Sequence, residues 1–148
     1  MRTVRALAAL AFIPLQAFAA DELPQELLLR CEGTMNAVAD LPEPQTHSGS
    51  FNISLRLRDR SIVDIRTGVV EGAECVQANG EIKCEAIKVY PQPNAVIKRS
   101  SSVFINRNTR ELTLWLESWN YQGSDASGTP TAHMRVLRTG ICRDDTVF

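Results

Sequence analysis

The sequence lacks several features that would place it in a well-defined class. No segment combines a capping residue, an apolar stripe with a 3.6-residue period and a stop signal, so no sustained helix is predicted. Its 16 Lys and Arg are balanced by 17 Asp and Glu, for a formal net charge of −1, which gives no general attraction to nucleic acid or anionic lipid. The four cysteines include no C-x₂-C pair and lie far from both histidines, which argues against a zinc site. We therefore predict no nucleic-acid partner, no metal and no cofactor.

Catalytic motifs are missing as well. His47 lies in a Pro-rich stretch and His133 on a predicted strand, and no G-x-S-x-G motif accompanies either of them. Neighbouring acids, such as Asp144 and Asp145, are interpreted as solvated groups rather than as the carboxylate pair of a glycosidase. No catalytic residue is predicted, and a hydrolase without a recognisable motif ranks third among the functions considered.

The N-terminus has the pattern of a targeting segment. Arg2 and Arg5 precede an apolar run over residues 6–18, and Ala17-Phe18-Ala19 fits an A-x-A cleavage site. The run is shorter than the ~20 apolar residues of a membrane-spanning helix. We predict a signal peptide over residues 1–19, a periplasmic or secreted protein with no transmembrane segment after cleavage, and a single domain over residues 20–148.

The four cysteines become interpretable once export is assumed. All of them follow the signal peptide, and an even number in an oxidising compartment suggests disulfides, with three possible connectivities. Asn79-Gly80 is a strong signal for a type I′ hairpin turn, and it sets Cys75 opposite Cys84 in a pair whose side chains lie close. The remaining bond is then Cys31–Cys142, which would join the first strand of the domain to the last.

Alternation of apolar and polar residues predicts strands along the whole domain. We expect strands over residues 27–38, 50–58, 61–67, 95–105, 111–121 and 132–137, besides the two arms of the hairpin around Asn79-Gly80, the second of which reaches Tyr90. Residues 39–48 are expected to be a linker, Pro91 and Pro93 to break the sheet, and residues 100–102 to lie at a bend or an edge. The prediction is an all-β protein of about eight antiparallel strands, in a small barrel or a sandwich, cross-linked by two disulfides.

Several short motifs resemble those of a group of small exported β-proteins of Gram-negative bacteria. They are Leu29-Arg30-Cys31-Glu32-Gly33, the Cys75/Cys84 pair, Ile105-Asn106-Arg107 leading into Glu111-Leu112, and Gly140-Ile141-Cys142. One departure is Arg110, which stands where a glycine is expected before Glu-Leu; if that position needs a positive φ, either Arg110 is strained or the loop differs. The resemblance implies compartment and fold, and no chemistry.

Two binding functions remain open from the sequence. In the strand over residues 111–121, Leu112, Leu114 and Leu116 lie on one face, and Trp115, Trp119 and Tyr121 lie on the other. If the leucines fill the core, the aromatic row is exposed; the alternative is that loops cover the strand on both sides. This row predicts a non-catalytic binding or inhibitor-like module whose partner is a protein or envelope component of unknown identity, although the Ser-Gly-x-x-Tyr loop of lysozyme inhibitors is absent. The alternative is a small lipocalin-like carrier of an apolar ligand, without the Gly-x-Trp opening of lipocalins. An apolar cavity of several hundred Å³ would favour the carrier.

Overall fold

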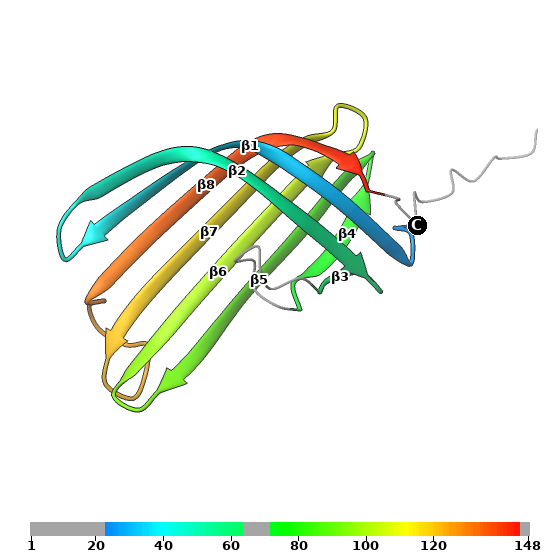
Figure 1. Ribbon diagram of the computed structural model, residues 1–148. Coiled ribbons are helices and arrows are strands. Elements are labelled where there is room, and N and C mark those ends of the chain that lie inside the picture. Colours follow the sequence, from blue (N-terminus) through cyan, green and yellow to red (C-terminus); the bar gives the residue numbers. More distant parts are fainter. Residues whose placement is uncertain (1–22, 64–71, 146–148) are drawn as a thin grey trace, which may run out of the picture.

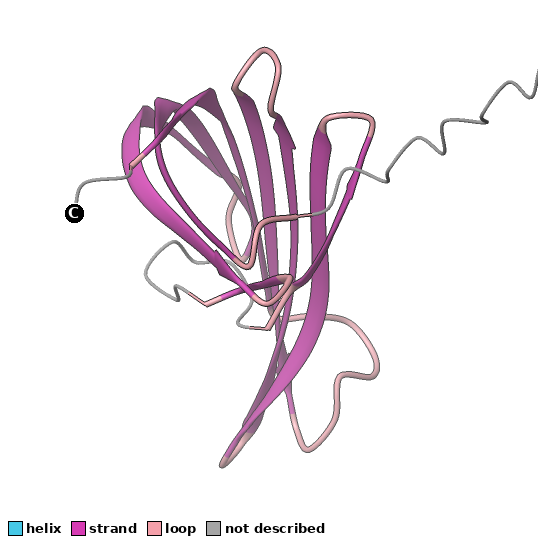
Figure 2. Ribbon diagram, turned by 90° about the vertical axis from the view of Figure 1, so that its right-hand side faces the viewer, coloured by secondary structure: helices cyan, strands magenta, loops and turns pink. Residues whose placement is uncertain are grey.

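The computed structural model describes residues 23–63 and 72–145, and this part of the chain is an all-β barrel (Figure 1). The predicted signal peptide lies outside the described residues. No helix in the described part is long and apolar enough to cross a membrane, and Figure 2 shows strands joined by loops. The strands are β1 (Glu26–Leu41), β2 (Gln45–Arg58), β3 (Ser61–Ile62), β4 (Glu74–Ala78), β5 (Glu81–Gln92), β6 (Ala95–Asn106), β7 (Glu111–Gln122) and β8 (Ala132–Asp144).

The strands follow one another around the barrel in chain order, and every neighbouring pair is antiparallel. The closing pair is β1 with β8, which decides between the two predicted architectures in favour of the barrel. This order is the simplest one for an antiparallel sheet, because each strand pairs with the strand just completed.

The hairpin between β4 and β5 has the predicted geometry. Asn79 and Gly80 have φ values of 53° and 76°, as a type I′ turn requires. The register places Cys75 opposite Cys84, and the two form a disulfide with their Cα atoms 4.0 Å apart. Asp59 and Arg60, which join β2 to β3, also have positive φ values, of 48° and 64°.

The contact between β1 and β8 is held by the second disulfide and by two glycines. Cys31 is directly opposite Cys142 and bonded to it, as predicted. Two residues further along β1, Gly33 is opposite Gly140. A Cβ atom on Gly140 would lie 2.1 Å from the carbonyl oxygen of Glu32, so only glycine permits the two backbones to approach this closely.

The hydrophobic core occupies one end of the barrel. Side chains alternate between the inside and the outside along each strand, and the inward residues near the two disulfides are almost completely buried. This end is closed because β3 and β4 bridge β2 and β5 there. The core consists of Leu27, Leu29, Cys31, Leu55, Leu57, Ile62, Ala73, Cys75, Ile82, Cys84, Val103, Ile105, Leu112, Leu114 and Cys142.

The other end of the barrel is open on one side. In β2, only Leu57 and Arg58 pair with β3, and in β5, only residues 81–85 pair with β4. Within the described chain, the rest of β2 and of β5 therefore pairs on one side only. In Figure 1 the short strands lie on the right, near the end of β8, and the longer strands continue to the left as a curved sheet in the order β2, β1, β8, β7, β6, β5. We call this part the open half.

Several predicted boundaries are wrong, and most of the errors fall in the open half. Residues 39–48 form not a linker but the end of β1, a short turn and the start of β2. Pro91 lies inside β5, which tolerates the missing N–H because β5 is an edge strand there. Residues 100–102 lie in the middle of β6, between β5 and β7. β8 extends from Ala132 to Asp144, well beyond the predicted end at residue 137.

The strand predicted over residues 61–67 is also shorter than expected. β3 contains only Ser61 and Ile62, Val63 lies outside any strand, and residues 64–67 fall outside the described residues.

Candidate functional site

The inward side chains of the open half form a concave surface, which we call the trough. They continue the rows of core residues on the same strands, but they are more exposed. Leu114 is completely buried, for example, whereas Leu116 is half-buried and Met134 is 46% exposed. The trough comprises Met35, Ala37, Phe51, Ala86, Lys88, Tyr90, Ile97, Arg99, Leu116, Ser118, Met134, Val136 and Arg138.

A pocket of about 270 Å³ lies in the trough on strands β6, β7 and β8. Its apolar side chains are Leu116 of β7 with Met134 and Val136 of β8, and Ser118 lies beside them. Arg99 of β6 and Arg138 of β8 line it from the two sides of β7. Ser100 and Glu117 also line it, at outward-facing register positions directly opposite each other. The pocket thus combines an apolar surface with two guanidinium groups.

Lys88 adds a third cation to the trough, next to Arg99. Lys88 of β5 is directly opposite Arg99 of β6. Both pack on the ring of Tyr90, with the Lys88 Nζ 5.8 Å and the Arg99 Cζ 5.5 Å from its centroid. This arrangement places two positive charges side by side on the concave surface, where each gains a cation–π contact.

Arg138 is the most enclosed of the three trough cations. Its Cζ lies 5.8 Å from the ring centroid of Phe51 on β2, so this contact spans the intervening strand β1. Burial lowers the pKa of the Arg138 guanidinium, because desolvation disfavours its charged form. Arginine nevertheless stays protonated in proteins, so the trough carries a partly desolvated positive charge.

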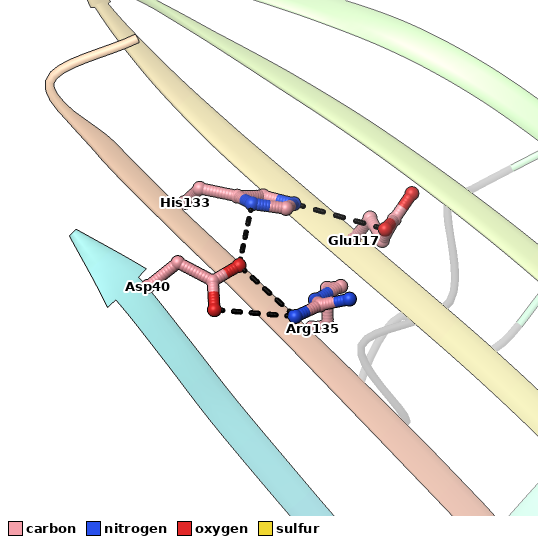
Figure 3. Close-up of polar contacts among 4 residues, drawn as sticks. All are labelled: Asp40, Glu117, His133 and Arg135. Carbon is pink, nitrogen blue, oxygen red and sulfur yellow. Dashed lines mark hydrogen bonds and ion pairs between the residues drawn. The ribbon is translucent and has the colours of Figure 1, made fainter. Parts of the chain in front are cut away.

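A separate polar cluster lies on the outer surface, where β1, β7 and β8 meet (Figure 3). His133 Nδ1 is 3.0 Å from Asp40 Oδ2, and His133 Nε2 is 3.7 Å from Glu117 Oε1. Arg135 donates a hydrogen bond of 3.1 Å from Nη2 to Asp40 Oδ1. Trp119 stacks on the His133 ring with a centroid distance of 5.3 Å. The Lys98 Nζ lies over the Trp119 ring, 5.4 Å from its centroid.

This outer cluster has the composition of a structural contact rather than of a reactive centre. It holds no Ser or Cys nucleophile, and no group of three metal-ligating side chains is found in the described ranges. Its bonds connect the end of β1 to β7 and β8 at the point where the β1–β8 register shifts between Ala39 and Leu41. It therefore strengthens the outer wall of the open half, behind the pocket.

Similarity to known proteins adds no second line of evidence about either site. No protein-family model, curated protein or solved structure matches this chain. The function must therefore be inferred from the geometry of the trough.

The three predicted binding residues all face outward on β7, but they do not form an exposed row. Trp115 and Trp119 are half-buried, and Tyr121 is only 9% exposed. Tyr121 therefore fits the alternative in which the outer face of this strand is covered. The β7–β8 loop folds back beside it, since the Thr131 N–H donates a 2.7 Å hydrogen bond to the Asn120 carbonyl.

The trough cations were missed at the level of sequence, although a signal for them exists. Arg99 lies in phase with the buried Val103 and Ile105, and Arg138 lies in phase with Gly140 and Cys142. A charged residue at an inward position of a strand marks the place where the core gives way to an open surface. The outward arginines Arg56 and Arg58, in contrast, both pair with Glu26 at 3.4 Å.

Proposed function

We propose that this is a binding protein that holds a small molecule with an apolar part in the trough. The observation that carries the proposal is the pocket of about 270 Å³ lined by Leu116, Met134 and Val136. Its size is close to the lower end of the range for small-molecule sites, and eight-stranded barrels are the smallest that can hold one small ligand. This is the lipocalin-like alternative, and the burial of Tyr121 lends it weight over an outer aromatic surface.

The exposed apolar side chains of the trough provide the driving force. Inward-facing residues of a small barrel normally fill its interior, yet Met134 is 46% exposed and Leu116 is only half-buried. A ligand that covers them gains about 0.8 kcal/mol for each CH₂ group removed from water. Affinity should therefore rise about fourfold per added carbon until the pocket is filled.

We also propose that the protein works outside the cytoplasm. The residues 1–19 have the pattern of a cleavable signal peptide, and the two disulfides are compatible with an oxidising compartment. The ligand would then be one that is present in the periplasm or in the secreted medium.

The proposal is tested with uncharged ligands, so that the result depends on the apolar surface alone. Isothermal titration of 1-alkanols from hexanol to decanol into the oxidised protein should give an affinity that rises with chain length. Ser118→Phe should abolish this binding by filling the pocket from β7. Thr113→Phe is the matched control, because Thr113 is an exposed, outward residue of the same strand and should leave binding unchanged. No binding of any alkanol, or equal binding to Ser118→Phe, would refute the proposal.

A further inference from the structure

We propose that the ligand is an anionic amphiphile, a single alkyl chain with a carboxylate or phosphate head group, and that Lys88, Arg99 and Arg138 bind the head group. This inference rests on the proposed function, since the alkyl chain would occupy the pocket described above. It adds the chemical class of the ligand, which the apolar surface does not specify.

Lys88 and Arg99 are positioned to share an anion. Like charges directly opposite each other on neighbouring strands destabilise a sheet, and this pair faces the concave side of β5 and β6. Both are exposed at the trough surface, so an anion from solvent can reach them. An oxyanion placed between them would relieve the repulsion and accept hydrogen bonds from both side chains.

The pocket places guanidinium groups beside its apolar surface. Arg99 and Arg138 stand on either side of β7 with Leu116 and Val136 between them. Arginine binds carboxylate and phosphate through paired N–H donors, and a partly buried cation such as Arg138 gains more from an approaching anion than an exposed one does. An alkyl chain lying on Leu116 therefore has a guanidinium within the same pocket for its head group.

Acids are distributed unequally between the two faces of the sheet. Several outward cations have outward acidic partners: Arg143 is 2.7 Å from Glu32, Lys83 is 3.0 Å from Glu85, and Arg135 is 3.1 Å from Asp40. Along the described strands, the inward positions carry no acid except Asp144, which lies at the closed end beside Leu27 and Leu29. The trough is thus positive and apolar, which is complementary to an anionic amphiphile.

The test compares ligands that share one chain and differ in the head group. Decanoate, decyl phosphate and decan-1-ol are titrated calorimetrically into the oxidised protein at low and at high salt. We expect both anions to bind at least tenfold more tightly than decan-1-ol at low salt, and this advantage to shrink as salt screens the charges. Comparing carboxylate with phosphate identifies the preferred head group.

Variants locate the head group. Lys88→Gln with Arg99→Gln, and separately Arg138→Gln, should each remove most of the tenfold advantage, measured for each variant as the ratio of its affinity for the anion to its affinity for decan-1-ol. This ratio corrects for any change in the apolar pocket, which Arg99 and Arg138 help to line. Arg143→Gln is the matched control, an exposed outward cation of β8 whose loss should leave the ratio at its native value. Binding of decan-1-ol by each variant also shows that the variant is folded.

The outcomes separate this inference from the function on which it rests. Equal binding of decanoate, decyl phosphate and decan-1-ol would overturn the anionic head group and leave the apolar ligand standing. Binding of none of the three would overturn both. Binding of inorganic phosphate as tightly as decyl phosphate would overturn the amphiphile, because the alkyl chain would then contribute nothing.

Discussion

At the scale of single residues, the glycine pair Gly33 and Gly140 decides how closely β1 and β8 approach. The pair lies one alternation step from the Cys31–Cys142 disulfide, where the core ends and the trough begins. Any side chain at Gly140 would be driven into the backbone of Glu32, which cannot move aside as a flexible side chain can. The two glycines are therefore needed for the barrel to close at this seam.

We predict that Gly140→Ala lowers the free energy of unfolding by about 3 kcal/mol or more, because its Cβ would lie 2.1 Å from the Glu32 carbonyl oxygen. Gly49→Ala is the matched control: its new Cβ would have only the His47 Nε2, at 3.7 Å, as a neighbour. It should leave stability within about 1 kcal/mol of the native chain. Chemical denaturation measures both, and a loss under about 1 kcal/mol in Gly140→Ala would contradict the close approach.

At the scale of elements, the β6–β7 loop contains a residue in an unfavourable conformation. Arg110 has a φ of 64°, so the condition under which its side chain was predicted to be strained is met. Its carbonyl nevertheless accepts a 2.8 Å hydrogen bond from the Cys142 N–H. The loop thus ties the start of β7 to the end of β8 at the cost of a left-handed residue.

We predict that Arg110→Gly stabilises the protein by about 0.5–1 kcal/mol. Relief of the left-handed conformation is worth about 1–2 kcal/mol, and the greater freedom of glycine in the unfolded chain takes back about half of that. Thermal melting should show a rise in Tm of a few degrees. Arg107→Gly in the same loop serves as the comparison: Arg107 does not have a positive φ, and its replacement should lower Tm. A fall in Tm for Arg110→Gly would show that its side chain matters more than its backbone.

The elements that sequence could predict are those specified by local chemistry or by burial. The hairpin register followed from Asn79-Gly80 because the turn needs two positive φ values, and its cysteine pair then left only one partner for Cys31. The strand beginning near Phe51 was visible because its inward residues are apolar. The start of β2 was not predicted, because residues 42–50 are all exposed and their inward positions need not be apolar.

The same reasoning explains why the candidate site was missed. Lys88, Arg99 and Arg138 are inward residues of the open half, where no core selects apolar side chains. Their phase with the buried residues of the same strands points them inward, but one β-bulge would reverse that phase, and the sequence does not show that the pairing continues without a bulge. The burial of Tyr121 could not be settled from the sequence either, because whatever covers the outer face of a strand leaves no mark in the alternation of that strand's own residues.

At the scale of the whole molecule, both covalent cross-links lie in the closed half. Cys31 and Cys142 are separated by 111 positions in the sequence, and Cys75 and Cys84 are separated by nine. In the chain-entropy model the longer loop contributes about 4.7 kcal/mol and the shorter about 2.5 kcal/mol. The first bond therefore carries more of the stability that a small, half-open barrel needs.

We predict that replacing Cys31 and Cys142 by Ala costs about 2 kcal/mol more than replacing Cys75 and Cys84 by Ala. The two double variants are well matched, since all four cysteines are at most 2% exposed and belong to the same core. Guanidinium unfolding of each variant, with its remaining disulfide verified by thiol titration, measures the difference. An equal or larger loss for the hairpin bond would mean that the long-range bond restricts the unfolded chain less than its loop length implies.

Glu26 begins β1 and Asp144 ends β8, and the Asp145 N–H donates a 2.9 Å hydrogen bond to the Leu28 carbonyl, so the first and last described strands start and finish together at the closed half. Figure 1 shows this shared end opposite the β1–β2 and β5–β6 turns. A tether attached before β1 or after β8 would leave the ligand surface facing away from its anchor. Immobilising the protein on a sensor chip through either of these two chain ends, or fusing a reporter there, should thus preserve access to the pocket.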